Sequence, residues 1–239
     1  MVTQRGSNRD YVYEIVKNNI LNMKLEPGTL ISEKEISEKL KVSRTPTREA
    51  FIKLAEEELI VIYPQKGSFV SLIDLEQVDE ARFVREHMEA AILRIACATF
   101  EEKDLLDLEA LISQQVIYSG NSDYEKANLE KLHALDEEFH RTLFIKCGKE
   151  WTWNVIQQML GHYKRFRNLL LAVYFDWETI ILQHMRIVEY IRNRNFEMVE
   201  QELRSHLKTR FEKDALLKKY PNYFKESADR QFPPLKKML

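Results

Sequence analysis

The apolar residues between Asp74 and Tyr220 recur at helical spacing, and no convincing strand pattern interrupts them. This feature constrains the fold most, because helices with one apolar stripe each are stable only when they bury those stripes against one another. We therefore expect a mainly α chain with an antiparallel bundle of six or seven helices over 74–220. The helices are predicted at about 75–99, 103–118, 124–147, 151–173, 177–193 and 196–219, with Asp176 and Asn195 as N-caps of the last two.

The first 73 residues follow a different pattern, in which short helical stripes alternate with turn signals. Helices are predicted at about 9–23, 33–40 and from the turn after Ser43 to Glu57, with capping side chains at Ser32 and Ser43. Two β-rich runs, 59–63 and 68–71, flank a Pro-Gln-Lys-Gly turn and predict a hairpin. Three short helices and a hairpin predict a winged helix-turn-helix over 1–73, followed by the bundle and by an irregular tail over 221–239.

The third predicted helix carries the residues expected to read DNA. Arg44, Thr45, Thr47 and Arg48 lie in its first turn or just beyond it, where a helix inserted in the major groove faces bases and phosphates. Arginine suits both targets, and the helix N-terminus adds amide donors for phosphate. Lys66 and Gly67, at the hairpin tip, are placed to contact the adjacent backbone or minor groove. The alternative is a small helical domain that docks another protein.

Charge and composition limit the remaining classes of protein. The net charge of −2 excludes a general nucleic-acid coat, although 34–53 holds a local basic excess. No apolar run is long enough to span a bilayer, the N-terminus lacks a signal-peptide pattern, and two cysteines are too few for a disulfide scaffold. We expect a cytoplasmic protein without a membrane partner.

Ionisable side chains fall within the apolar stripes of three predicted helices. Asp136 and His140 lie four residues apart on one face, His184 lies among isoleucines, and His206 lies in the stripe of the last helix. Burying such groups unpaired costs several kcal/mol or shifts their pKa. A shared divalent transition metal, Zn²⁺, Ni²⁺ or Mn²⁺, would satisfy all four through one oxygen and three nitrogens.

Two alternatives to a sensory metal site stay open at this point. Each histidine taken alone is more commonly a hydrogen-bonded core residue, and His133 competes as a ligand because it shares the face of Asp136. A metal with open positions could also activate water, as in a metal-dependent hydrolase. Only Glu137 or Glu138 is available as a general base, and both are equally well explained as surface charges. We therefore predict that the chain is not an enzyme.

Four motifs lie between residues 9 and 72: Leu25-Glu-Pro-Gly-Thr-Leu-Ile-Ser-Glu33, Val42-Ser-Arg-Thr-Pro-Thr-Arg-Glu-Ala50, Glu57-Glu-Leu-Ile60 and Lys66-Gly-Ser-Phe-Val70. Together they resemble the DNA-binding domain of GntR-family bacterial transcription regulators. The resemblance implies operator contacts at Lys34, Arg44, Thr45, Thr47, Arg48 and Gly67. The chain departs from the family pattern at Lys34, Thr47 and Glu58, and the first two departures leave the operator sequence open.

The run Asp136-Glu-Glu-Phe-His140, followed by His184 and His206, is similar to the signature of the all-helical effector domain (FCD) of the FadR-type subfamily. In metal-binding members the matching positions hold a divalent cation that a small carboxylate contacts. The resemblance places Arg85 near that cavity, where it would pair the effector carboxylate, with Arg82 as a second candidate. An intrahelical pair between Arg85 and Glu89 is an equal alternative.

These observations together predict a ligand-responsive bacterial transcription regulator. We expect a repressor that binds a near-palindromic double-stranded operator as a homodimer and senses a small carboxylate at the metal site. A DNA-binding dimer that takes no ligand is the alternative.

Overall fold

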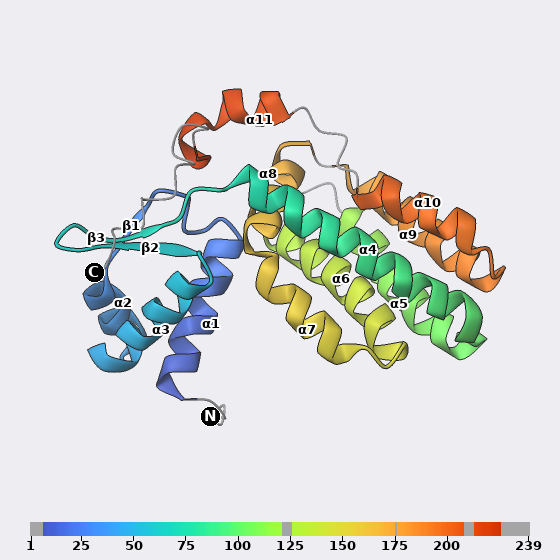
Figure 1. The fold of residues 1–239 in the computed structure, drawn as a ribbon, viewed down its shortest axis with the longest axis horizontal. Coiled ribbons are helices and arrows are strands. Elements are labelled where there is room, and N and C mark those ends of the chain that lie inside the picture. The colour runs from blue at the N-terminus through green and yellow to red at the C-terminus, as the bar shows by residue number, and fades with distance from the viewer. Residues whose placement is uncertain (1–6, 121–125, 175, 208–212, 226–239) are drawn as a thin grey trace, which may run out of the picture. The chain divides into compact units, whose positions relative to one another are not determined.

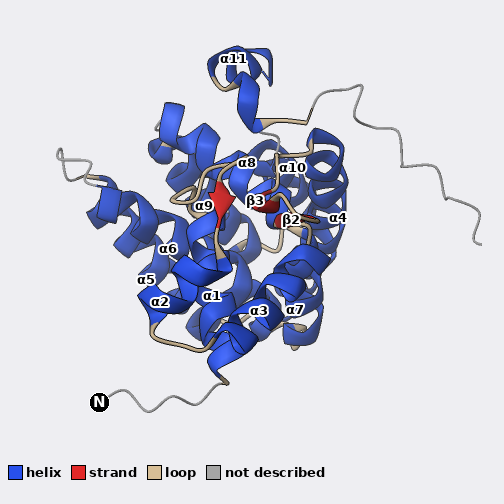
Figure 2. Ribbon diagram, turned by 90° about the vertical axis from the view of Figure 1, so that its left-hand side faces the viewer, coloured by secondary structure: helices blue, strands red, loops and turns tan. Residues whose placement is uncertain are grey.

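The computed structural model describes residues 7–120, 126–174, 176–207 and 213–225. These residues divide into two compact units, one within Met1–Val78 and Glu212–Leu239 and the other within Asp79–Phe211. Helix predominates, and the described strands all belong to the first unit (Figure 2). None of the described helices combines the length and the apolar character needed to cross a lipid bilayer.

The first unit is the predicted winged helix-turn-helix (Figure 1). Its helices α1 and α2 both pack against α3, and its antiparallel sheet has the order β1-β3-β2. Strand β1 escaped prediction because two residues are too few to show an alternating pattern. The elements are α1 (Asn8–Leu21), β1 (Leu30–Ile31), α2 (Glu33–Leu40), α3 (Arg44–Glu56), β2 (Ile60–Tyr63) and β3 (Gly67–Val70).

The core of this unit joins one face of α1 to α3 and to the sheet. Burying these apolar side chains drives the packing that holds α3 in place. The buried residues are Val12, Tyr13, Val16, Ile20, Ile31, Ala50, Phe51, Leu54, Leu59, Ile60 and Val70.

The N-termini of α2 and α3 differ in their capping. The Ser32 hydroxyl accepts a hydrogen bond from the amide of Glu35 at 3.3 Å, as predicted. Ser43 makes no side-chain cap hydrogen bond, contrary to its predicted role. The first turn of α3 therefore keeps amide donors that no capping side chain occupies.

Seven helices of the described chain form the predicted antiparallel bundle (Figure 1). Helix α5 packs against α6 and α9, and α9 packs against α10. The predicted helix 151–173 is two helices that meet at Leu160, where ψ is 6° and Gly161 follows, a residue that weakens helical continuity. The bounds are α4 (Leu75–Thr99), α5 (Glu102–Ser119), α6 (Lys126–Lys146), α7 (Glu150–Met159), α8 (Gly161–Tyr174), α9 (Trp177–Arg192) and α10 (Phe196–Leu207).

The C-terminal residues belong to the winged unit. Helix α11 (Lys213–Lys219) and the 3₁₀-helix η1 (Pro221–Tyr223) lead to Phe224, which forms a parallel bridge with Ile73. The Ile73 amide donates to the Tyr223 carbonyl at 2.8 Å, and the Lys225 amide donates to the Ile73 carbonyl at 3.0 Å.

For residues 213–225, this return of the chain differs from the expected boundaries, which placed residues up to 220 in the bundle and 221–239 in an irregular tail. The rest of that expected tail, 226–239, lies outside the described residues. Phe224 and Ile73 are both buried, and the Lys225 ammonium pairs with the Asp74 carboxylate at 3.0 Å. Helical periodicity identifies an apolar face but not its partner, so it could not assign this segment to the winged unit.

Candidate nucleic-acid interface and metal centre

Helix α3 presents a basic, exposed first turn. Arg44, Thr45 and Arg48 are exposed, and the buried residues Ala50 and Phe51 anchor the opposite side of the helix in the core. An arginine pair one turn apart beside uncapped helix amides is a favourable site for phosphate and for guanine edges.

Thr47 and Lys34 differ in their placement. Thr47 is fully buried, and its hydroxyl donates to the Ser43 carbonyl at 3.1 Å, so it does not share the exposed face expected of it. A β-branched side chain at this position instead fills the interior of the winged unit. Lys34 is exposed near the start of α2, with its ammonium 4.0 Å from Glu38.

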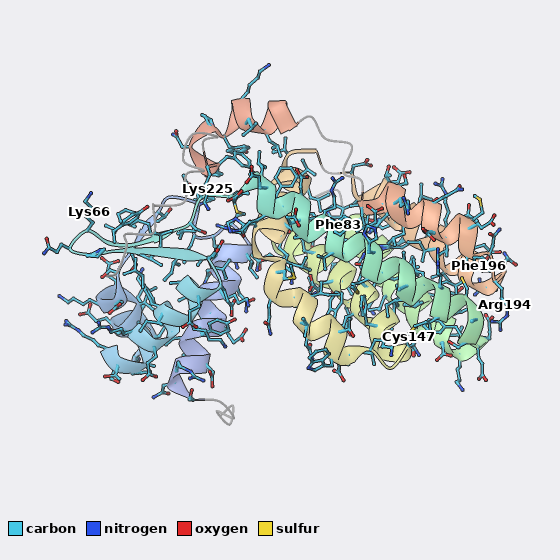
Figure 3. The ribbon with its side chains drawn as sticks, in the orientation of Figure 1. Lys66, Phe83, Cys147, Arg194, Phe196 and Lys225 are labelled. Atoms are coloured by element: carbon cyan, nitrogen blue, oxygen red, sulfur yellow. The ribbon has the colours of Figure 1, made fainter. Side chains whose placement is uncertain are left out.

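The wing tip carries the remaining residues of the predicted DNA set. Lys66 and Gly67 are exposed at the β2–β3 turn, and Figure 3 shows Lys66 at the end of the hairpin. Gly67 has φ of 111°, and a Cβ atom there would lie 2.9 Å from the Leu30 side chain. The positive φ therefore favours glycine at this position, whereas the exposed Leu30 side chain could move aside for a Cβ atom.

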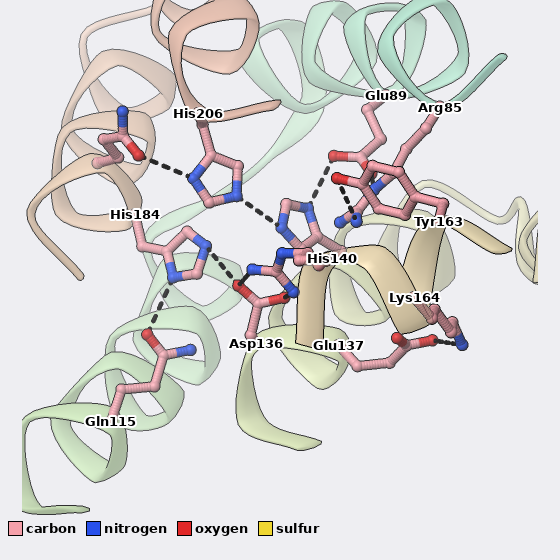
Figure 4. Close-up of polar contacts among 12 residues, drawn as sticks. Arg85, Glu89, Gln115, Asp136, Glu137, His140, Tyr163, Lys164, His184 and His206 are labelled. Carbon is pink, nitrogen blue, oxygen red and sulfur yellow. Dashed lines mark hydrogen bonds and ion pairs between the residues drawn. The ribbon is translucent and has the colours of Figure 1, made fainter. Parts of the chain in front are cut away.

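Four side chains of the bundle bring their ligand atoms together, and they are the four predicted from the sequence: Asp136, His140, His184 and His206. Their oxygen and nitrogen ligand atoms all lie within 4.8 Å of one another (Figure 4). They come from α6, α9 and α10, and Asp136, His140 and His184 are almost fully buried. The Nε2 atoms of His140 and His206 are 3.1 Å apart, and Nε2 of His184 is 3.6 Å from an Asp136 oxygen.

The other ring nitrogen of each histidine faces an oxygen (Figure 4). Nδ1 of His184 lies 2.9 Å from Oε1 of Gln115, and Nδ1 of His206 lies 3.1 Å from Oε1 of Gln183. Nδ1 of His140 lies 2.7 Å from a carboxylate oxygen of Glu89.

Burial favours the neutral forms of His184 and His206. It lowers the pKa of His184 to about 3, although the Asp136 carboxylate opposes the shift, and it lowers the pKa of His206 well below the ordinary value. A neutral imidazole offers a nitrogen lone pair, which is the form that binds metals.

Asp136 is ionised and paired. Burial alone would raise its pKa, but the Arg167 guanidinium beside it holds the pKa well below its usual range. The two guanidinium nitrogens of Arg167 donate to the two oxygens of Asp136, both at 2.6 Å.

The two candidate effector-binding arginines occupy different environments. Arg85 is buried, donates from Nε to Glu89, and lies 3.5 Å from the Tyr163 hydroxyl through Nη1. Its intrahelical pair with Glu89 is therefore formed, and Glu89 links it to His140. Arg82 is partly exposed, and its guanidinium lies 3.5 Å from Asp79.

His133, the competing ligand, lies outside the four-residue cluster. It is packed edge-on against Trp177 with ring centroids 5.2 Å apart, and burial lowers its pKa to about 3. The identity of the partners around the cluster was not predicted: Arg167, Glu89, Gln115 and Gln183 come from four helices. Of these four residues, Gln115 could have been singled out from the sequence, because it occupies a position on the same apolar helix face as Leu108 and Ile112.

Comparison with known proteins gives consistent matches over both units. Residues 8–70 match the family of bacterial regulatory proteins of the gntR type, and residues 80–209 match the FCD domain. The HTH-type transcriptional repressor RspR of Escherichia coli K12 is 34% identical over 82% of this chain and 84% of its own. An uncharacterised HTH-type regulator of Streptomyces ambofaciens is 30% identical over 88% of this chain and 86% of its own.

Solved structures share the fold. McbR/YncC of E. coli superposes with a TM-score of 0.70 at 19% identity, covering 90% of this chain and 99% of its own. A regulator from Rhodococcus sp. RHA1 gives a TM-score of 0.63 at 22% identity, covering 84% and 94%. The matched families and relatives are transcription regulators and not enzymes.

Proposed function

The chain belongs to the gntR family of bacterial regulatory proteins and carries an FCD domain, and from this premise we propose that it is a metal-dependent repressor that senses a small carboxylate. It would bind operator DNA in the cytoplasm as a homodimer. Each winged unit would place Arg44, Thr45 and Arg48 at one half-site, with Lys66 and Gly67 on the neighbouring backbone. The similarity to a protein named as a repressor supports the direction of control.

The single observation that carries the sensory part of the proposal is the meeting of histidine Nε2 atoms in the bundle. An amide oxygen of Gln183 lies 3.1 Å from Nδ1 of His206, and a carboxylate oxygen of Glu89 lies 2.7 Å from Nδ1 of His140. Both oxygens favour a ring proton on Nδ1, which would leave a lone pair on each Nε2. Two such lone pairs facing each other at 3.1 Å repel unless a cation lies between them. Two nitrogens bound to one zinc ion lie about 2.9–3.3 Å apart, which accommodates this distance.

Asp136, His140, His184 and His206 would therefore hold a divalent ion, zinc, nickel or manganese. The bound cation would supply open positions for a carboxylate oxygen, since the protein offers four ligands. His206 is partly exposed, whereas the other three members of the set are buried.

Arg85 is better placed than Arg82 to bind the part of an effector that the metal does not hold. Its Nε is held by Glu89, which contacts the His140 ring, and its Nη1 lies 3.5 Å from the Tyr163 hydroxyl. A carboxylate bound there would pair with a buried arginine that is already oriented.

The proposal is tested by elemental analysis of untagged protein purified without chelator, together with DNA binding. We expect close to one metal ion per chain in the wild type and loss of metal in His184→Ala. Citrate, used as a chelating carboxylate, should change the affinity for an in-vitro-selected duplex in the wild type and not in His184→Ala. Wild-type protein that takes up no zinc, nickel or manganese would refute the sensory part and leave a DNA-binding dimer.

A further inference from the structure

We infer that Gln115 and Gln183 are positioning residues, which fix His184 and His206 in the Nδ1-protonated tautomer so that both Nε2 atoms face a common point. This inference deepens the metal site proposed above and rests on it. Neither glutamine touches the place where the ion would lie, so each acts through the histidine that it contacts.

The geometry repeats at each histidine of the cluster. Gln115 on α5 lies 2.9 Å from Nδ1 of His184, and Gln183 on α9 lies 3.1 Å from Nδ1 of His206. Glu89 on α4 contacts Nδ1 of His140 at 2.7 Å. Three oxygens from three helices thus face the Nδ1 atoms, while every Nε2 atom points inward.

The chemistry of these oxygens sets the tautomer. An amide or carboxylate oxygen only accepts, so the ring must place its single proton on Nδ1. The opposite tautomer would leave two acceptors face to face at Nδ1 and would put a proton on Nε2, where it blocks metal coordination. Outer partners of this kind orient metal-binding histidines, and losing one typically weakens metal binding about 10–100-fold.

Of the two glutamines, Gln115 allows the more decisive test. It is fully buried, and its Nε2 has no hydrogen-bond partner among the described residues, so only its oxygen is used. Glutamate at this position would keep that oxygen and lose no existing hydrogen bond. Its neighbour Gln114 is exposed and contacts only the carbonyl of Ala110, at 3.5 Å, in the described structure. Gln114→Met therefore provides a matched control for Gln115→Met.

The experiment measures zinc affinity by competition with a chromophoric chelator in the full chain. We expect zinc binding to weaken about 10–100-fold in Gln115→Met and in Gln183→Met. Gln114→Met should stay within about twofold of the wild type, and Gln115→Glu should restore most of the affinity lost in Gln115→Met. Equal affinities in Gln115→Met and Gln114→Met, with the wild type binding zinc, would overturn the inference while the metal site stands.

A second measurement needs no metal. Nitrogen-15 chemical shifts of the histidine rings in chelator-treated protein report the tautomer directly. His184 should show a protonated Nδ1 and an unprotonated Nε2 in the wild type and in Gln115→Glu, and a mixture in Gln115→Met. A predominantly Nε2-protonated His184 in the wild type would overturn the inference, whereas a wild type that takes up neither zinc, nickel nor manganese would overturn the proposed metal site.

Discussion

Replacing Asp136 by asparagine should destabilise the metal-free bundle by about 3–5 kcal/mol, the range observed when one partner of a buried ion pair is removed. Asparagine keeps the shape of the side chain but removes its charge. The Arg167 guanidinium, whose side chain is 12% exposed, would then lose one of its two 2.6 Å hydrogen bonds and its counter-charge, and would keep at most one bond to the amide oxygen. At about 2–4 °C per kcal/mol for a chain of this size, the expected loss in melting temperature is about 6–20 °C.

Urea unfolding in the presence of EDTA is the appropriate assay, because it separates the ion pair from any bound metal. The double variant Asp136→Asn/Arg167→Met should recover most of the lost stability, since it no longer buries an unpaired charge. If Asp136→Asn and the wild type unfold at the same urea concentration in EDTA, the ion pair between Asp136 and Arg167 does not stabilise the bundle as its geometry indicates.

The difference in stability between the wild type and Asp136→Asn should depend on pH in a predictable direction. The folded pKa of Asp136 lies well below its unfolded value of about 3.9, so the pair contributes fully above that value. Its contribution decreases as the pH falls toward the folded pKa. The stabilities of the wild type and Asp136→Asn should therefore differ fully at pH 7 and converge only in strong acid.

Three further predictions concern the winged unit. If Arg44 and Arg48 contact phosphate, Arg44→Ala and Arg48→Ala should each lower the slope of log affinity against log salt by about 0.9; if they read guanine, each should cost about 1–3 kcal/mol of base discrimination. Fluorescence anisotropy between 50 and 200 mM salt distinguishes these two outcomes, and wild-type DNA binding in both variants would contradict the interface. Ser32→Ala should cost about 0.5–2 kcal/mol in urea unfolding, and Ser43→Ala less, because only Ser32 makes a cap hydrogen bond; equal costs would contradict the capping difference. Phe224→Ala should destabilise the winged unit by about 3–5 kcal/mol in the same assay, and an unchanged transition would show that the C-terminal segment is not docked.

Much of the fold could be predicted because apolar helix stripes and turn residues depend only on residues that are close together in the sequence. The predicted helix over 75–99 coincides with α4, and the metal-ligand candidates could be singled out because Asp136 and His184 stand where an apolar residue is expected. The apolar stripe does not mark the interruption at Leu160, where α7 ends and α8 begins.

The partners of the site could not be predicted because they depend on which helices become neighbours. Arg167 meets Asp136 across 31 positions of sequence, and Gln115 meets His184 across 69. A spacing rule within one helix says nothing about such pairs. Thr47 shows the reverse case. Its position in α3 could be predicted from the sequence, but the direction of its side chain is set by packing in the core.

Because Ile73 forms a bridge with Phe224, the winged unit consists of two segments that the ribosome makes at different times. Asp74 and its partner Lys225 are separated by 151 positions. At about 5–20 residues per second, a ribosome adds Lys225 about 8–30 s after Asp74. During that interval Ile73 has no Phe224 to cover it, while the whole bundle is being made. The winged unit therefore reaches its final packing only after translation has passed through the helical bundle, which ties the maturation of one to the production of the other.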